Sequence, residues 1–256
     1  MAGFLGFGNY AKPGKGVKKN GPQKKKFFQF FEVYFRKFGK LIQLNLIYVL
    51  FCIPIITIGP ATVAMTKIAR CFIEEKPVFL FSDFWDAFKS NFKQGLVIGL
   101  LDGLVTYCII VAYIFYFQQA LANNLYWLLL GVMTAFTLIF VFANFYIYLM
   151  TATVNLKVLH LIKNAFLLAF LGMKTNFITF FFTALLVVPT VLFFPLTIPV
   201  MLVILYSTVT MITAFNSFQY IYKYMIRPYY FTNGLPDPYE EKEEETPETA
   251  IFEDMT

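Results

Sequence analysis

One side chain in the long apolar part of the chain has the chemistry to relay protons or to bind cations. Asp102 is the only charged residue between Lys93 and Lys157, and it lies about 10 Å inside the apolar segment that begins near residue 95. If that segment is embedded in a bilayer, a charge there costs at least about 2.5–3.5 kcal/mol, and intramembrane acids often mark ion or substrate pathways. Asp102 is therefore the first candidate for a functional site.

A structural role for Asp102 competes with a role in transport. One acid without a second intramembrane charge makes a poor relay, so the structural interpretation is favoured. The preferred partners are Lys67 and Arg70, which lie on a predicted helix of the N-terminal part. The alternatives are a protonated carboxyl group and a hydrogen bond to a Tyr, Thr or Asn of a neighbouring helix.

A helix break is predicted at Pro54, Gly59 and Pro60, because two prolines and a glycine fall within seven residues. Pro60 can begin a new helix that extends to about residue 73. In transporters, interrupted helices bind ions or substrates through free backbone groups. A tight re-entrant turn, satisfied by neighbouring helices, is the favoured interpretation here because no second such break is found. Whether residues 60–73 cross the membrane or re-enter it is left open.

Other chemically active residues are sparse. Cys52, Cys71 and Cys108 lie far apart without a Cys-x-x-Cys pair, and His160 is the single histidine. We therefore expect no metal site, no cofactor, no catalytic residue and no enzyme activity. The chain also lacks a P-loop motif, which argues against direct ATP binding.

Composition and charge pattern predict the elements that must position these residues. The chain of 256 residues is 59% hydrophobic and 14% charged, whereas soluble domains have about a quarter charged residues. Lys40 and Lys67 enclose 26 uncharged residues, and Lys174 and Lys223 enclose 48. At about 1.5 Å per helical residue, these runs exceed the roughly 30 Å of a bilayer core. We expect an all-α, polytopic membrane helical bundle whose surroundings are the lipid bilayer.

Charge also predicts the topology. Four full crossings are expected, over residues 95–117, 125–150, 177–194 and 199–218, beside an N-terminal broken or re-entrant helix pair. This arrangement places all 21 Lys and Arg on one side, which the positive-inside rule identifies as the cytosol. Nucleic-acid binding is not expected, since the net charge of +6 comes from residues that flank membrane segments.

Three amphipathic helices are expected on the cytosolic face, over residues 27–38, 83–93 and 156–171. Docking to a partner competes with simple packing of these helices on lipid headgroups, and their number on one side favours docking. The aromatic face of the second helix is the candidate docking face and consists of Phe84, Trp85, Phe88 and Phe92.

The expected organisation has three parts. Residues 1–26 form a basic, irregular cytosolic arm, residues 27–234 form the membrane helical domain, and residues 235–256 form an acidic, disordered tail. Both termini are then cytosolic.

The chain resembles the YesL-like family of bacterial integral membrane proteins, a domain of unknown function. The resemblance covers nearly the whole chain except the acidic tail. It rests on four stretches, namely residues 10–17, 45–54, 57–62 and 83–94. Members are usually encoded beside ABC-type sugar importers, so the resemblance implies an accessory or regulatory role in carbohydrate uptake at the bacterial cell membrane. It implies no catalytic residues, because the family defines none.

Two functions are therefore expected to compete. The first is a non-enzymatic membrane accessory subunit that binds the permease subunits of a carbohydrate ABC importer. The second is a small transporter or channel that uses Asp102 and the break at Gly59 and Pro60.

Overall fold

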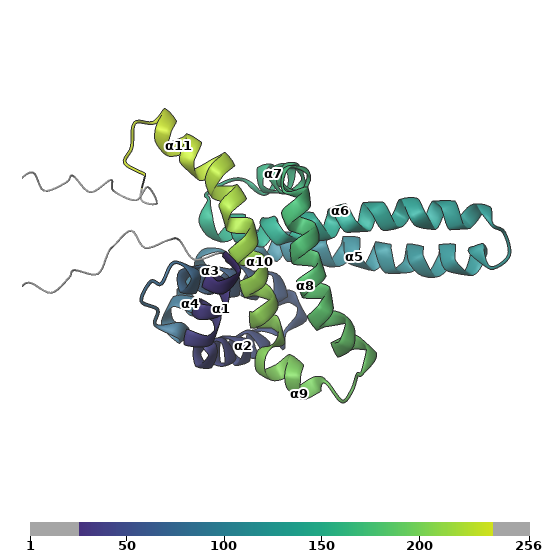
Figure 1. The fold of residues 1–256 in the computed structure, drawn as a ribbon, viewed down its shortest axis with the longest axis horizontal. Helices are drawn as coiled ribbons and strands as arrows, with labels where there is room; N and C mark the ends of the chain where they lie inside the picture. Colours follow the sequence, from purple (N-terminus) through teal and green to yellow (C-terminus); the bar gives the residue numbers. More distant parts are fainter. Residues whose placement is uncertain (1–25, 238–256) are drawn as a thin grey trace, which may run out of the picture.

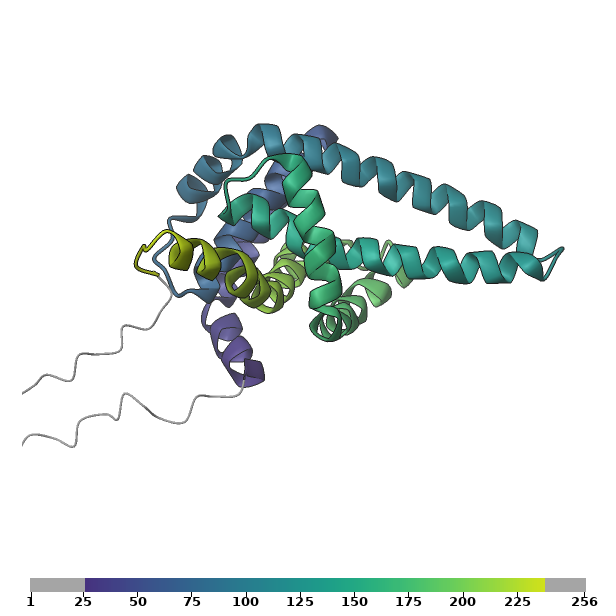
Figure 2. The same ribbon diagram turned by 90° about the horizontal axis from the view of Figure 1, so that it is seen from above.

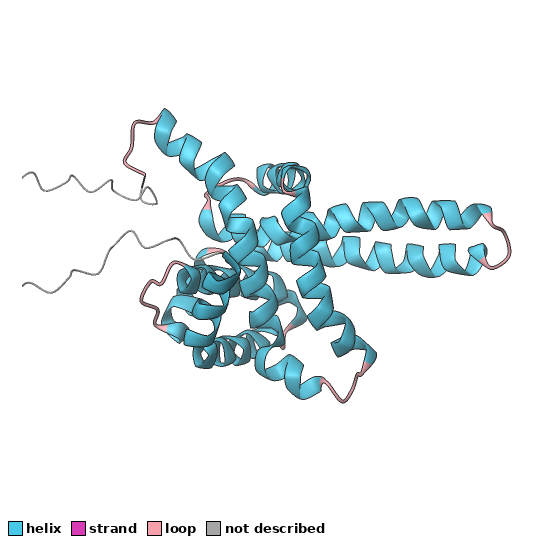
Figure 3. Cartoon of the chain, viewed as in Figure 1, coloured by secondary structure: helices cyan, strands magenta, loops and turns pink. Residues whose placement is uncertain are grey.

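The structure is a computed structural model that describes residues 26–237. Every regular element in this range is a helix, as Figure 3 shows. The expected all-α helical bundle is confirmed. The basic arm and most of the acidic tail predicted above lie outside the described residues.

The N-terminal unit consists of short helices arranged around the predicted break. Helix α1 (Lys26–Arg36) is followed by α2 (Phe38–Cys52), the 3₁₀ turn η1 (Ile55–Thr57), α3 (Ile58–Ile73) and α4 (Leu80–Ser90). Helix α2 ends just before Pro54, which has no N–H for the helical hydrogen-bond ladder. With 15 and 16 residues, α2 and α3 are about 22 and 24 Å long, shorter than a bilayer core. The combined run Ile55–Ile73 is long and apolar enough to cross, so the re-entrant path remains a prediction.

Helices α5 (Phe92–Ala120) and α6 (Leu125–Thr153) form a long hairpin that projects from the rest of the protein (Figure 1). Figure 2 shows the same projection after a quarter turn. Each arm has 29 residues and is apolar enough to span a membrane. Because no charged residue follows Asp102 before Lys157, the whole projecting part of the hairpin is uncharged.

The C-terminal part is a second hairpin. Helix α7 (Val158–Leu171) leads into α8 (Met173–Leu192), and a turn then leads into the helical run Ile198–Thr232. This run consists of α9 (Ile198–Val200), the π-helical η2 (Met201–Leu205), α10 (Tyr206–Ile221), the π-helical η3 (Tyr222–Ile226) and α11 (Arg227–Thr232). In Figure 1, α8 and α10 run crosswise to α5 and α6. The two hairpins therefore cannot both run along the bilayer normal.

Two apolar cores hold these parts together. The first lies among α6, α7 and α10, around the buried side chains of Tyr146 and Leu161. The second lies among α2, α3 and α4, around Leu44, Phe72 and Phe84. Helices α3 and α10 contribute residues to both cores, so they join the N-terminal unit to the C-terminal hairpin.

The hairpin is attached to α3 by direct contact between backbones, which we call the glycine crossing (Gly59 of α3 with Gly95 and Gly99 of α5). A Cβ atom on Gly59 would lie 2.1 Å from the carbonyl oxygen of Gly95 and 2.8 Å from Cα of Gly99. A Cβ atom on Gly95 would lie 2.8 Å from Cα of Pro60. The two helices thus run antiparallel here, at a distance that only glycine permits. Small residues four apart commonly allow such close packing between membrane helices.

We predict that Gly59→Ala lowers the free energy of unfolding by about 1–3 kcal/mol, since the added methyl group must displace backbone atoms. Gly103→Ala on α5 is the matched control, because a Cβ atom there has no neighbour within 4 Å. Denaturant unfolding of both variants in one detergent, followed by circular dichroism, measures the difference. Equal midpoints for the two variants would refute the role of the glycine crossing.

Candidate functional site

Asp102 lies on α5 and faces α6. Its Oδ2 atom accepts a hydrogen bond from the hydroxyl group of Tyr148 at 2.9 Å, and the side chain is half-buried. Asn144, one turn before Tyr148 on α6, also lies beside this carboxyl group. Asp102 therefore joins the two arms of the long hairpin close to its base.

The predicted pairing of Asp102 with Lys67 or Arg70 is wrong. Because α3 and α5 run antiparallel at the glycine crossing, the chain of α3 moves toward the beginning of α5 as it approaches Lys67 and Arg70. Asp102 lies beyond the crossing in the opposite direction. It has instead the alternative partner named above, a tyrosine of the neighbouring helix.

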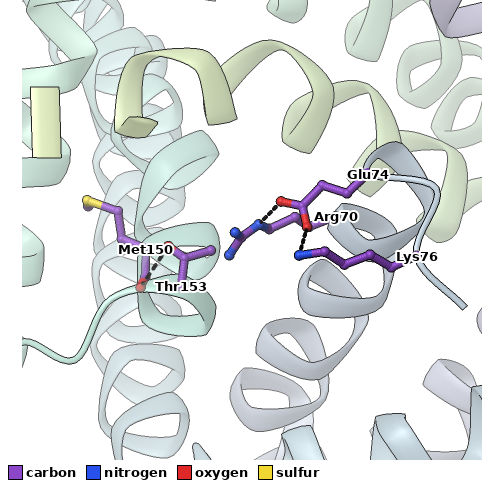
Figure 4. Close-up of polar contacts among 5 residues, drawn as sticks. All are labelled: Arg70, Glu74, Lys76, Met150 and Thr153. Atoms are coloured by element: carbon purple, nitrogen blue, oxygen red, sulfur yellow. Dashed lines mark hydrogen bonds and ion pairs between the residues drawn. The ribbon is translucent and has the colours of Figure 1, made fainter. Parts of the chain in front are cut away.

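Arg70 belongs to an ion-pair cluster at the end of α3 (Figure 4). Its Nε atom lies 2.6 Å from Oε1 of Glu74, and Nζ of Lys76 lies 2.6 Å from Oε2 of the same carboxylate. The Arg70 guanidinium group also lies 4.5 Å from the ring centre of Phe218 on α10. Figure 4 shows the cluster beside the end of α6, where Thr153 donates to the carbonyl group of Met150. The contact of Arg70 with Phe218 thus links the end of α3 to α10.

The chain leaves α3 through a left-handed residue that positions this cluster. Glu75 has φ +56°, and its N–H donates to the carbonyl group of Phe72 while the N–H of Lys76 donates to that of Cys71. This is the Schellman pattern that ends helices, with a glutamate where glycine is usual. The Glu75 side chain pairs with Arg36 at the end of α1, which links α1 to α3.

The carbonyl groups next to the helix break have a hydrogen-bond donor within the break itself. The hydroxyl group of Thr57 lies 2.6 Å from the carbonyl oxygens of both Phe51 and Pro54. Ile55 at the tip is 82% exposed, as expected for a turn surrounded by lipid. These contacts favour the interpretation of a closed turn over an ion-binding break.

Gly59 and Pro60 are buried, and they belong to the glycine crossing. Their backbone faces α5 and not a cavity. Neither of the two cavities described for the protein is lined by the break or by Asp102. The residues singled out for transport therefore lie in separate packed contacts.

The predicted docking face of α4 is used inside the protein. Phe84 is fully buried and Phe88 nearly so, and both rings pack against Phe51 of α2, with centres 5.1 and 5.0 Å apart. Trp85 stacks on Phe88, and Phe92 is half-buried beside it. The prediction that these residues meet an external partner is wrong for Phe84 and Phe88. Periodicity identifies an apolar face but cannot tell which surface covers it.

Asn45 is an important residue that sequence reasoning did not assign. It is fully buried on α2, and its side-chain amide donates to the carbonyl oxygens of Met201 at 3.0 Å and Leu202 at 2.7 Å. Its Oδ1 atom accepts from the N–H of Ser207 at 2.9 Å. One amide thus satisfies the backbone groups around the π-helical turn η2. An Asn in the middle of a mostly apolar segment was the available signal.

A second buried network fixes the turn between α7 and α8. Tyr146 donates to Oδ1 of Asn176 at 2.7 Å, and Asn176 donates to the carbonyl group of Ala169 at 2.9 Å. Gly172 leaves room for the Tyr146 hydroxyl group, since a Cβ atom at this position would lie 2.2 Å from its oxygen. The amphipathic helix predicted over residues 156–171 does end at Leu171, just before this glycine.

Potential metal ligands are dispersed. Within residues 26–237, no three His, Cys, Asp or Glu side chains gather closely enough to hold a metal ion. Cys52, Cys71 and Cys108 are free thiols on three different helices.

The fold and its apolar helices define a multi-pass α-helical membrane protein, with five helical runs that are long and apolar enough to cross a bilayer. Over residues 41–113 the chain is similar to a family described as a protein of unknown function, DUF624. This region includes α2, α3, α4 and most of α5, and thus both sides of the glycine crossing. A search of curated proteins and a search of solved structures each gave no match.

We predict a coupling free energy of about 0.6–1.7 kcal/mol between Asp102 and Tyr148, the range measured for hydrogen bonds between membrane helices. A double-mutant cycle with Asp102→Ala and Tyr148→Phe, read by unfolding in detergent, measures it. The matched cycle of Asp102→Ala with Arg70→Gln should give no coupling. Coupling in the second cycle but not in the first would restore the discarded ion pair.

Proposed function

We propose that the protein is a non-enzymatic membrane accessory subunit that binds the permease subunits of a carbohydrate ABC-type importer through the α5–α6 hairpin. The observation that carries the proposal is the exposure of this hairpin. In the most apolar stretches of α5 and α6, only 11% and 6% of residues are buried inside the protein, against 56% for Ile55–Ile73. Two membrane helices that pack so little on their own chain offer a large surface for other membrane helices.

Tyr107 favours a protein partner over lipid as the neighbour of this hairpin. It lies in the middle of α5, is 65% exposed, and has no hydrogen-bond partner for its hydroxyl group among the described residues. A phenol hydroxyl in hydrocarbon is costly without a partner. Gly103 lies one turn earlier, with open space beside it, so another helix can approach closely. We call the side of α5 that includes Gly103 and Tyr107 the hairpin face.

The class of partner follows from the resemblance to the YesL-like family, whose members are usually encoded beside carbohydrate ABC importers. The match over residues 41–113 supports the broader family likeness and names no partner. Permease subunits of such importers are themselves bundles of membrane helices, which suits a hairpin that lies in the bilayer.

The competing hypothesis, a small transporter or channel, predicts substrate or proton flux through the protein alone. Asp102 is hydrogen-bonded to Tyr148, and the break at Gly59 and Pro60 is packed against α5. These contacts favour a structural role for the residues that a transporter would use. Flux through purified protein in vesicles that Asp102→Asn abolishes would favour the transporter.

We predict that Tyr107→Phe weakens co-purification with the importer permease severalfold in mild detergent and leaves the unfolding midpoint unchanged. The lost hydrogen bond is worth about 0.6–1.7 kcal/mol between membrane helices. Tyr113→Phe is the control, because the hydroxyl group of Tyr113 donates to Thr134 within the hairpin at 3.0 Å. Equal permease recovery with both variants, or no recovery with the wild type, contradicts the proposal.

The charge distribution supports a location in the bacterial cell membrane with both termini in the cytosol. The turn at residues 121–124, at the tip of the projecting hairpin, has no charged side chain. Charged residues of the described part lie instead on the body or near the base of the hairpin, where Asp102 is found. The positive-inside rule then assigns the body end to the cytosol.

Cysteine labelling of intact cells tests this orientation. In a chain whose three native cysteines are replaced by serine, we expect an impermeant maleimide to label Asn123→Cys at the tip. It should leave Ser90→Cys and Lys163→Cys unlabelled until the membrane is opened. All three positions are exposed in the protein, so burial cannot explain a difference. Labelling of Ser90→Cys from outside would reverse the assignment.

A further inference from the structure

A cavity of about 420 Å³ lies between α1, α8 and α10. Its walls include Phe27, Phe30 and Tyr34 of α1, Phe182 and Leu185 of α8, and Phe215 of α10. Its volume is in the range of small-molecule sites. The exposed side chains along its α8 wall open it toward the surroundings of the helix, which in a bilayer are lipid.

Each polar side chain of the lining already forms a hydrogen bond within the protein. The hydroxyl groups of Tyr34 and Thr208 lie 3.0 Å apart, and the amide of Asn216 donates to Thr179 at 2.9 Å. The remaining walls are aliphatic and aromatic. Because the walls are almost entirely apolar and each polar side chain is already engaged, the fitting occupant is a hydrocarbon chain.

One end of the cavity is positively charged. Helix α1 runs antiparallel to α10, because Phe30 packs on Phe215 while Tyr34 meets Thr208. Helix α8 does the same, because Thr175 meets Tyr220 while Thr179 meets Asn216, so α1 and α8 run in the same direction. Lys174 continues the lining face of α8 one turn before Ile178, at the end where α1 begins.

Lys223 lies at the same end of α10, in the turn that follows. Among the described residues, neither Lys174 nor Lys223 forms an ion pair. The Lys223 ammonium group does lie 5.4 Å from the ring centre of Tyr224. Two cations without a carboxylate partner at the end of an apolar cavity match the shape and charge of a lipid with an anionic head.

We infer that this cavity binds one anionic phospholipid, with an acyl chain between α1, α8 and α10 and the phosphate group beside Lys174 and Lys223. The inference depends on the membrane location of the protein and is independent of the proposed importer partner. Because α1 supplies one wall of the cavity, the bound lipid would also hold this amphipathic helix against the C-terminal hairpin.

Native mass spectrometry of the full-length chain in detergent tests the site, with palmitoyl-oleoyl-phosphatidylglycerol as the anionic probe and palmitoyl-oleoyl-phosphatidylcholine as the zwitterionic one. We expect one tightly bound phosphatidylglycerol. Leu185→Trp fills the cavity and should abolish this binding, whereas Val188→Trp should retain it. Both residues are more than half exposed on α8, and Val188 does not line the cavity.

The charge is tested with Lys174→Gln, which should lower the preference for phosphatidylglycerol about fivefold, as expected for one cation beside an anionic lipid. Lys163→Gln on α7 is the control and should leave the preference unchanged. Phosphatidylglycerol with a diazirine in its acyl chain should label wild-type peptides from α1 and from residues 178–186, which tests the site without any substitution. Equal binding of both lipids by the wild type, equal retention by Leu185→Trp and Val188→Trp, or labelling confined to other helices would overturn the inference.

Discussion

The architecture depends on the direct contact between the backbones of α3 and α5. At the glycine crossing, no side chain separates the two helices, and the distances leave no room for a Cβ atom on Gly59. This contact fixes where the long hairpin leaves the body and in which direction it runs. Since α3 also joins the two apolar cores, the same contact relates the hairpin to the C-terminal helices. The family match over residues 41–113 includes both sides of the crossing, so the part of the chain that resembles known proteins is the part that contains this constraint.

Around this contact, most polar groups within the helices are satisfied inside the protein, as a bilayer requires. The Thr57 hydroxyl group lies within hydrogen-bond distance of the carbonyl groups at the break, and the Asn45 amide donates to those at η2. The Tyr148 hydroxyl group donates to Asp102. Among the described residues, the buried hydroxyl group of Ser217 is an exception without a partner. The exposed exceptions, Tyr107 on the hairpin face and Lys174 beside the cavity, are more informative. An unpaired polar group at a lipid-facing surface indicates a binding partner that the isolated protein does not contain. Both proposals start from such groups for this reason.

Sequence reasoning succeeded where one physical signal dominates and failed where two surfaces compete for the same side chain. Helix α6 begins at Leu125 as expected, and the ends of α5 and α8 differ from the predicted crossings by only a few residues. A long uncharged run has few alternatives to a membrane helix. The aromatic face of α4 was correctly identified as apolar, but its neighbour proved to be Phe51 of the same chain. The ion pair expected for Asp102 is absent because Lys67 and Arg70 lie on the other side of the antiparallel crossing.

By itself, the sequence determined that the surroundings of the protein are a lipid bilayer and that its secondary structure is helical. The segregation of charge and the length of the apolar runs predict helices in a bilayer, because a helix satisfies all the backbone groups of such a run within the segment itself. Only the tertiary structure decided which residues meet. Asn45 lies 156 residues from Met201, and Phe30 of α1 packs on Phe215 of α10. Such contacts depend on the relative direction of helices, which is set by close packing over a few small residues, and periodicity along a single helix contains no information about that direction.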